Sequence, residues 1–125
     1  MAGILDGIRV IDLSQGLAGA LASLLMAEQG ADVIKVEPPG GDPTREIEAG
    51  FFIWNRSKRS VTLDLNLAAD RDRLRKLLEG ADVMVESFTI AQSQRFQIDY
   101  ADLKASLPHL IHCKISGYGM DHRDK

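Results

Sequence analysis

The sequence predicts an α/β fold with a mainly parallel, doubly wound sheet. Short runs of β-branched residues alternate along the chain with longer helical patterns, and this alternation is typical of parallel strands joined by helices. Two similar octapeptides, GADVIKVE at Gly30–Glu37 and GADVMVES at Gly80–Ser87, mark the same transition twice. In each, a glycine suited to the left-handed position past a helix end precedes residues suited to a buried strand.

The first half of the chain contains three predicted strands and one helix. The apolar run IRVIDL places a strand at Arg9–Leu13, and Leu, Ala and Met on most faces of Leu17–Gln29 predict a well-buried helix. Valine-rich runs place the next strands at Asp32–Glu37 and Val61–Leu65. The prolines and glycines of Pro38–Pro43 indicate the one substantial loop.

The second half continues the alternation. An amphipathic helix is expected at Ala68–Glu79, with leucines on one face and Arg71, Arg75 and Glu79 on another. The remaining elements are expected as strands at Asp82–Glu86 and His112–Ser116 and as short helices at Ile90–Phe96 and Tyr100–Ser106. Because no linker composition interrupts the pattern, all 125 residues are expected to form one domain.

Composition excludes several classes of protein. A net charge of −3 argues against broad affinity for nucleic acids or anionic membranes, which requires surplus Lys and Arg. The longest apolar run, Leu17–Ala27, is much shorter than a bilayer span. Cys113 is the only cysteine, so no intrachain disulfide can form, and a reducing cytoplasmic location is expected. The protein is therefore expected to be soluble and to bind neither nucleic acid nor membrane.

The expected ligand site is the edge of the sheet where the strands end. In a parallel sheet the carboxyl ends of all strands meet at one edge, and ligands bind just beyond it. The segments predicted to converge there are Ser14–Ala18, Pro38–Gly41, Leu65–Asn66, Ser87–Thr89 and Gly117–Gly119.

Common ligand motifs are missing from these segments. The run SQGLAGA after the first strand has G-x-x-G where a dinucleotide site has G-x-G-x-x-G, so Glu37 lacks the context of a ribose-binding acid. There is no Walker motif and no G-x-S-x-G elbow. His109, His112 and His122 do not have the spacing of zinc ligands, so no metal site is expected.

A basic cluster at Asn55–Ser60 allows two interpretations. Arg56, Lys58 and Arg59 follow three aromatic residues and precede a strand. They either form a solvated turn or, with Arg95, bind the phosphates of an adenine nucleotide. The residue pattern does not decide between the two.

The sequence resembles the family III CoA-transferases, the group that includes formyl-CoA transferase, carnitine CoA-transferase and α-methylacyl-CoA racemase. The matching stretches occur in family order and cover nearly all of the chain: LDGIRVIDLSQGLAG, LLMAEQGADVIKVEPPGGDPTR, NRSKRSVTLDLN, LLEGADVMVESF and ISGYG. The chain departs from the family pattern at Ala18-Gly19-Ala20, where A-G-P is usual, at Pro38, where a basic residue is common, and at Ser87–Ala91, which lacks the usual N-F-x-P-G turn.

The resemblance implies that residues 1–125 are the incomplete N-terminal part of a Rossmann-like domain that binds CoA. It also implies a dimer, with CoA or an acyl-CoA thioester as substrate and no tightly bound cofactor. Carried over by motif, the CoA contacts would be Leu17, Ala18, Leu63, Asp64, Leu65, Asn66, Ser87, Phe88 and Arg95.

The resemblance also implies that the catalytic residues lie outside this sequence. In the transferases an aspartate becomes acylated, and in the racemases a His and an Asp move the α-proton; the family places these residues after the ISGYG stretch. No catalytic residue is therefore expected here, and the chain alone should be inactive. Three hypotheses stay open: the N-terminal portion of an acyl-CoA:carboxylate CoA-transferase, a portion of an α-methylacyl-CoA racemase, or a non-catalytic nucleotide-binding or scaffold module.

Overall fold

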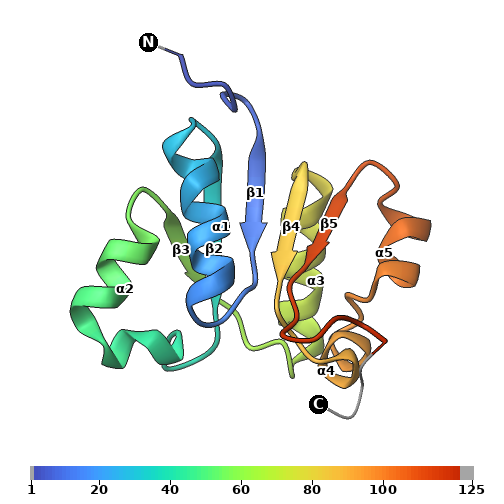
Figure 1. Cartoon of the computed structure of the whole chain (residues 1–125). Coiled ribbons are helices and arrows are strands. Elements are labelled where there is room, and N and C mark those ends of the chain that lie inside the picture. Colours follow the sequence, from blue (N-terminus) through green and yellow to red (C-terminus); the bar gives the residue numbers. More distant parts are fainter. Residues whose placement is uncertain (1, 122–125) are drawn as a thin grey trace.

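The computed structural model describes residues 2–121, which form one five-stranded sheet with helices on both sides (Figure 1). All neighbouring strands are parallel, and their order is β3-β2-β1-β4-β5. The predicted α/β class with a parallel sheet is confirmed. The central strand β1 lies between β2 and β4, so the chain changes direction across the sheet at this strand.

The elements of the first half build one side of the sheet from β1 outward. They are β1 (Arg9–Asp12), α1 (Leu17–Glu28), β2 (Asp32–Glu37), the 3-10 helix η1 (Pro43–Glu46), α2 (Glu48–Asn55) and β3 (Arg59–Thr62). The second half crosses to the other side of β1 with α3 (Ala68–Glu79), β4 (Val83–Glu86), α4 (Ile90–Arg95), α5 (Tyr100–Ser106) and β5 (Ile111–Lys114).

Two apolar cores cover the two faces of the sheet. On one face, Ile11, Ile34 and Met84 of the strands pack with Leu78 of α3 and Leu103 of α5. On the other, buried valines of β1, β2 and β4 pack under α1, which contributes Met26 and Ala27. Alternate residues of a strand point to opposite faces, which explains how each central strand supplies both cores. Figure 1 shows α1 and α3 on opposite sides of the sheet.

Several predicted boundaries are wrong by one to three residues, and one helix was not predicted. The largest strand error concerns β3, which was expected at Val61–Leu65 but pairs with β2 only from Arg59 to Thr62. The backbone N–H of Leu63 still donates a hydrogen bond to the Glu37 carbonyl, and the chain then leaves the sheet. The helix α2 occupies the segment interpreted only as aromatic residues before a turn.

The two octapeptide glycines end their helices differently. Gly30 has φ 103, so the predicted left-handed position is confirmed there. Gly80 has φ −95 and ψ 9, and the prediction is wrong at this position. A third glycine is required for packing: a Cβ on Gly19 would lie 2.1 Å from Ser14 Cβ, so only glycine lets the start of α1 approach the loop after β1.

Candidate functional site

A cavity of about 80 Å³ lies at the carboxyl ends of β1, β2 and β4 and just beyond β3. This is the edge where ligands bind in open parallel sheets. Residues at or just after four strand ends, together with the residue that caps the C-terminus of α4, line it: Leu13, Gln15, Val36, Glu37, Pro38, Pro39, Leu63, Asp64, Leu65, Asn66, Phe88 and Phe96.

The loops after β1 and β4 meet beside this cavity. The backbone N–H of Gln15 donates to Ser87 Oγ at 3.0 Å, and Ser87 Oγ donates to the Gln15 carbonyl at 3.3 Å. The chain runs from β1 to β2 on one side and from β4 to β5 on the other, so the order of the strands reverses between β1 and β4. Ser87 therefore joins the two loops at the topological switch of the sheet.

The far lip of the cavity is formed by Asn66 and two aromatic rings. Phe88 and Phe96 pack edge to face with ring centroids 5.2 Å apart. The guanidinium of Arg95 lies 5.8 Å from the Phe96 ring centroid and donates to Asn66 Oδ1. Two apolar rings, Phe88 and Phe96, and the exposed guanidinium of Arg95 thus lie side by side at this edge of the cavity.

The structure brings together most, but not all, of the residues predicted to bind CoA. Five of them line the cavity: Leu63, Asp64, Leu65, Asn66 and Phe88. Arg95 and Ser87 do not line the cavity themselves. Arg95 bonds Asn66 and Ser87 bonds Gln15, and both of these partners line it. Leu17 and Ala18 are exposed in the first turn of α1 and do not line the cavity.

The interpretation of the basic cluster as phosphate ligands is wrong. Arg59 is at the start of β3, at the opposite end of the sheet, and pairs with Asp32 at 2.6 Å. Arg56 pairs with Glu28 at 2.6 Å. Lys58 is buried, with its side chain only 1% exposed. Arg56 and Arg59 are thus paired with carboxylates away from the carboxyl edge, and the buried Lys58 ammonium is already bonded to Asp12 at the end of β1.

Lys58 belongs to a buried polar network between the sheet, α1 and α2. Its Nζ donates to Ala20 O at 2.8 Å and to Asn55 Oδ1 at 2.9 Å, and it lies 3.3 Å from Asp12 Oδ2. The Asp12 carboxylate also accepts from the hydroxyls of Ser14 and Ser23. Burial lowers the pKa of Lys58 in spite of the attraction of Asp12. Every polar group of this part of the network has a partner.

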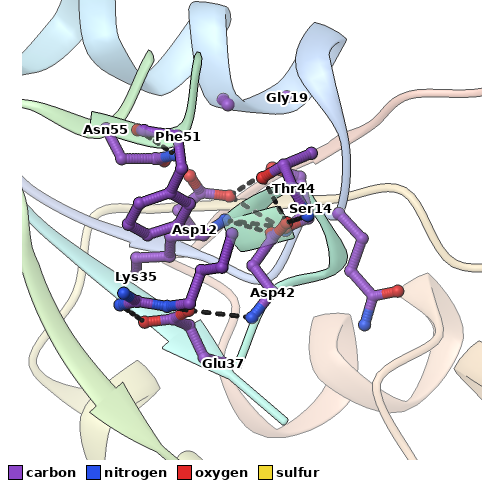
Figure 2. Close-up of polar contacts among 12 residues, drawn as sticks. Asp12, Ser14, Gly19, Lys35, Glu37, Asp42, Thr44, Phe51 and Asn55 are labelled. Carbon is purple, nitrogen blue, oxygen red and sulfur yellow. Dashed lines mark hydrogen bonds and ion pairs between the residues drawn. The ribbon is translucent and has the colours of Figure 1, made fainter. Parts of the chain in front are cut away.

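A second ion pair in the same network holds the loop after β2. Lys35 Nζ lies 2.9 Å from Asp42 Oδ2 and donates to the carbonyl of Ser14 at 3.0 Å, and both side chains of the pair are 1% exposed. Burial acts to raise the pKa of Asp42, but the bonds from Thr44 and Lys35 outweigh it and the pKa is lowered. One ammonium group thus joins the loop after β1 to the loop after β2 (Figure 2).

Glu37, the last residue of β2, also holds the loop that follows β2. It accepts from Arg45 Nε and Nη2 at 2.7 Å each, from the Asp42 N–H at 2.9 Å and from the hydroxyl of Ser60. The Arg45 guanidinium is the main cause that lowers the pKa of Glu37 to about 2. Glu37 is therefore a structural anion and not the ribose-binding acid of a dinucleotide site.

Sequence reasoning missed this network because a lysine in the middle of a strand is ordinarily read as exposed. The available signal was the pattern DVIKVE, in which Lys35 and Glu37 fall on the same face as Val33. Since that face is covered by α1, both charges must be buried, and buried charges require partners.

A larger cavity of about 390 Å³ lies between α4, α5 and β5. Its polar floor is Glu86, which accepts from Lys114 Nζ at 2.7 Å and lies 3.1 Å from His112 Nε2. Burial acts to raise the pKa of Glu86, but the bonds from His112 and Lys114 outweigh it and lower the pKa. Lys114 Nζ also bonds Phe88 O and Ser93 Oγ, so its hydrogen-bonding capacity is filled by the protein.

Residues 2–121 contain neither a metal-binding cluster nor a membrane-spanning helix. No group of three or more His, Cys, Asp or Glu side chains in this part of the chain is arranged to hold a metal ion. Among the described helices, none has the length and apolar character needed to cross a membrane.

The sequence matches the model of CoA-transferase family III over residues 5–125. A succinyl-CoA:mesaconate CoA-transferase of Haloarcula hispanica is 43% identical over 94% of this chain and 33% of its own length. A succinate–glutarate CoA-transferase of Agrobacterium fabrum is 39% identical over 92% of this chain and 32% of its own. The chain thus spans about a third of the length of these curated relatives.

Solved structures show the same likeness. A CAIB/BAIF family protein from Brucella suis superimposes with a TM-score of 0.91 at 38% identity, over 95% of this chain and 35% of that one. A protein from Mycobacterium tuberculosis gives a TM-score of 0.94 at 36% identity, over 99% of this chain and 37% of that one. A short-chain dehydrogenase/reductase family protein, at 19% identity and a TM-score of 0.54, shares the fold alone.

Proposed function

This chain belongs to CoA-transferase family III, and on that premise we propose that it is the N-terminal, CoA-binding portion of an acyl-CoA:carboxylate CoA-transferase. The named relatives exchange CoA between dicarboxylic acids, which supports a carboxylate as the acceptor. Because the chain spans about a third of their length, the complete reaction is proposed for the whole protein and only CoA binding for these residues.

The observation that carries this proposal is the cavity at the carboxyl edge. Leu63, Asp64, Leu65, Asn66 and Phe88 come from two segments separated by a helix and a strand, yet they line one cavity. The same positions are those that the family motifs assign to CoA. A cavity of about 80 Å³ encloses only part of such a ligand, so the rest of the CoA is expected to lie across the edge of the sheet.

Three buried carboxylates of the described residues agree with the expectation that this portion alone is inactive. Transfer through an acylated aspartate requires a carboxylate oxygen that is free to attack the thioester. Asp12, Glu37 and Glu86 are buried and bonded within the protein. These three are therefore not candidates for the nucleophile, and, following the family resemblance, we propose that the nucleophile and the acid and base of a racemase lie after the ISGYG stretch.

Calorimetry with CoA and dephospho-CoA tests the proposed binding. CoA is expected to bind more tightly by about 1–3 kcal/mol, because the extra phosphate gains charge-assisted hydrogen bonds. Pro38 and the altered Ser87–Ala91 loop should keep the affinity too low for CoA to be retained through purification. Equal affinity for the two ligands would contradict engagement of that phosphate, and acyl exchange catalysed by this chain alone would contradict the placement of the nucleophile.

We also propose that the 125-residue chain self-associates. Several large apolar side chains are more than half exposed, among them Leu25, Phe52, Ile53 and Ile111. In addition, β3 and β5 are the outer strands of the sheet and leave backbone groups unpaired. Sedimentation velocity at high micromolar concentration is expected to show a dimer or larger species, and a strictly monomeric boundary would exclude this proposal.

A further inference from the structure

Three loops from three different strands border the cavity at the carboxyl edge. Gln15 follows β1, Pro38 follows β2 and Phe88 follows β4. The backbone pairing of β1 with β2 ends at Asp12 and Lys35. Beyond this pair, the side chain of Lys35 joins the loop after β1 to the loop after β2.

One peptide group, formed by the carbonyl of Ser14 and the N–H of Gln15, is held from both neighbouring strands. Its carbonyl accepts from Lys35 Nζ of β2 at 3.0 Å. Its N–H donates to Ser87 Oγ, just after β4, at 3.0 Å. Because a peptide group is planar, a contact that orients the carbonyl also orients the N–H. Lys35 therefore sets the direction in which the Gln15 N–H meets Ser87.

The Lys35 ammonium is itself fixed in place. It lies 2.9 Å from Asp42 Oδ2, and both side chains are 1% exposed (Figure 2). Asp42 caps η1 by accepting from the Thr44 N–H at 2.7 Å, and its own N–H donates to Glu37 Oε1 at 2.9 Å. A buried charge that left its partner would be strongly disfavoured, and a bond donated by a charged group is stronger than a neutral one. The ammonium is thus a firm support for the Ser14 carbonyl.

We propose that Lys35 is a positioning residue of the carboxyl edge. Through the Ser14–Gln15 peptide it holds Ser87, and with it the loop after β4, in a fixed place relative to the loop after β2. Lys35 does not line the cavity, so it acts through this peptide and not by touching a ligand. The inference rests on the proposed function only where it names CoA as the ligand of this edge.

Hydrogen exchange of the 125-residue chain, followed by NMR, tests the role of Lys35 without any ligand. In Lys35→Met/Asp42→Asn the Gln15 amide should exchange about ten-fold faster than in the wild type, because its peptide has lost a charge-assisted bond. The Leu13 amide is the internal control, since it donates to the Val85 carbonyl at 2.7 Å and does not depend on Lys35. An unchanged Gln15 rate, or equal acceleration at both amides, would overturn the inference.

A second variant separates this effect from a general loss of stability. Leu103 is buried in α5 on the opposite face of the sheet, so Leu103→Ala destabilises the protein without touching the Lys35 contacts. The ratio of the Gln15 and Leu13 exchange rates should stay at its wild-type value in this variant. A ratio that changes as much as in Lys35→Met/Asp42→Asn would show that stability alone controls the Gln15 amide, which would contradict the proposal.

Ser87→Ala tests the same peptide from its other end. It removes one hydroxyl from a half-buried side chain and leaves both buried ion pairs intact, so this variant serves even if the Lys35 variant does not fold. The 15N signal of the Lys35 ammonium should shift, because the carbonyl that it bonds belongs to the peptide that Ser87 holds. The Lys58 ammonium, which bonds Ala20 O and Asn55 Oδ1, is the control and should not shift. A Lys35 signal identical to the wild type would contradict the coupling.

CoA affinity, measured by calorimetry, tests the consequence for binding. Lys35→Met/Asp42→Asn should bind CoA about five-fold more weakly, because the loops must then be ordered when the ligand binds. Leu103→Ala should keep the wild-type affinity. Wild-type affinity in the Lys35 variant would show that Lys35 does not position the edge for CoA. If the exchange and ammonium results are as expected but the wild type binds no CoA, the role of Lys35 holds and the proposed function fails.

Discussion

Replacement of Lys35 by methionine is expected to lower the free energy of unfolding by about 3–5 kcal/mol. The substitution keeps the length of the side chain but leaves the Asp42 carboxylate buried without its counter-ion, at a site where both side chains are 1% exposed. It also removes the donor to the Ser14 carbonyl. Urea unfolding followed by circular dichroism measures the loss.

The double variant Lys35→Met/Asp42→Asn tests whether the loss of stability comes from the unpaired Asp42 charge or from altered packing. Asparagine keeps an acceptor for the Thr44 N–H, which now bonds Asp42 Oδ1 at 2.7 Å, but it carries no charge. Most of the lost stability should therefore return, because replacing both members of a buried pair is far less costly than removing one. A single variant that loses less than about 1 kcal/mol would show that this ion pair does not fix the loop.

Replacement of Glu37 by glutamine is expected to cost about 3 kcal/mol at pH 7. The pKa of Glu37 falls from its ordinary value of 4.5 to about 2 in the folded protein, chiefly through the bonds from Arg45. Because the folded pKa is the lower one, the stabilisation is fully present above pH 4.5 and is lost as the pH falls from 4.5 to 2.

The difference in stability between wild type and Glu37→Gln should therefore shrink as the pH is lowered and vanish near pH 2. Denaturant unfolding at several pH values between 7 and 2 measures it. Glu79→Gln, on the exposed face of α3, is the matched control and should follow the wild type at every pH. A difference that stays constant from pH 7 to pH 2 would mean that the Glu37 charge contributes nothing to folding.

The number of strands and their parallel type were predictable because apolar, β-branched runs alternate with segments of helical period. The end of β3 was not predictable from the sequence. The run SVTLDL keeps residues typical of strands after Thr62, where the pairing with β2 ends. The helix α2 was missed because its aromatic residues and the basic residues that follow do not give a clear helical period.

The site was partly predictable for a similar reason. Leu63–Asn66 and Phe88 carry family motifs and lie at strand ends, so both sequence arguments agree on them. The role of Lys35 could not be assigned from the sequence, because the pattern DVIKVE places it on a covered face but does not show that its ammonium group bonds Ser14. Side chains as long as lysine cover several ångströms, and only tertiary structure shows which way they fold.

The most direct test of CoA binding at the carboxyl edge is the map of amide shifts when the 125-residue chain is titrated with CoA. We expect shifts at the proposed contacts in the loops after β1, β3 and β4 and at Arg95, and unchanged signals at His112 and Lys114 beside the larger cavity. Shifts confined to that larger cavity, or none at saturating CoA, would contradict the account.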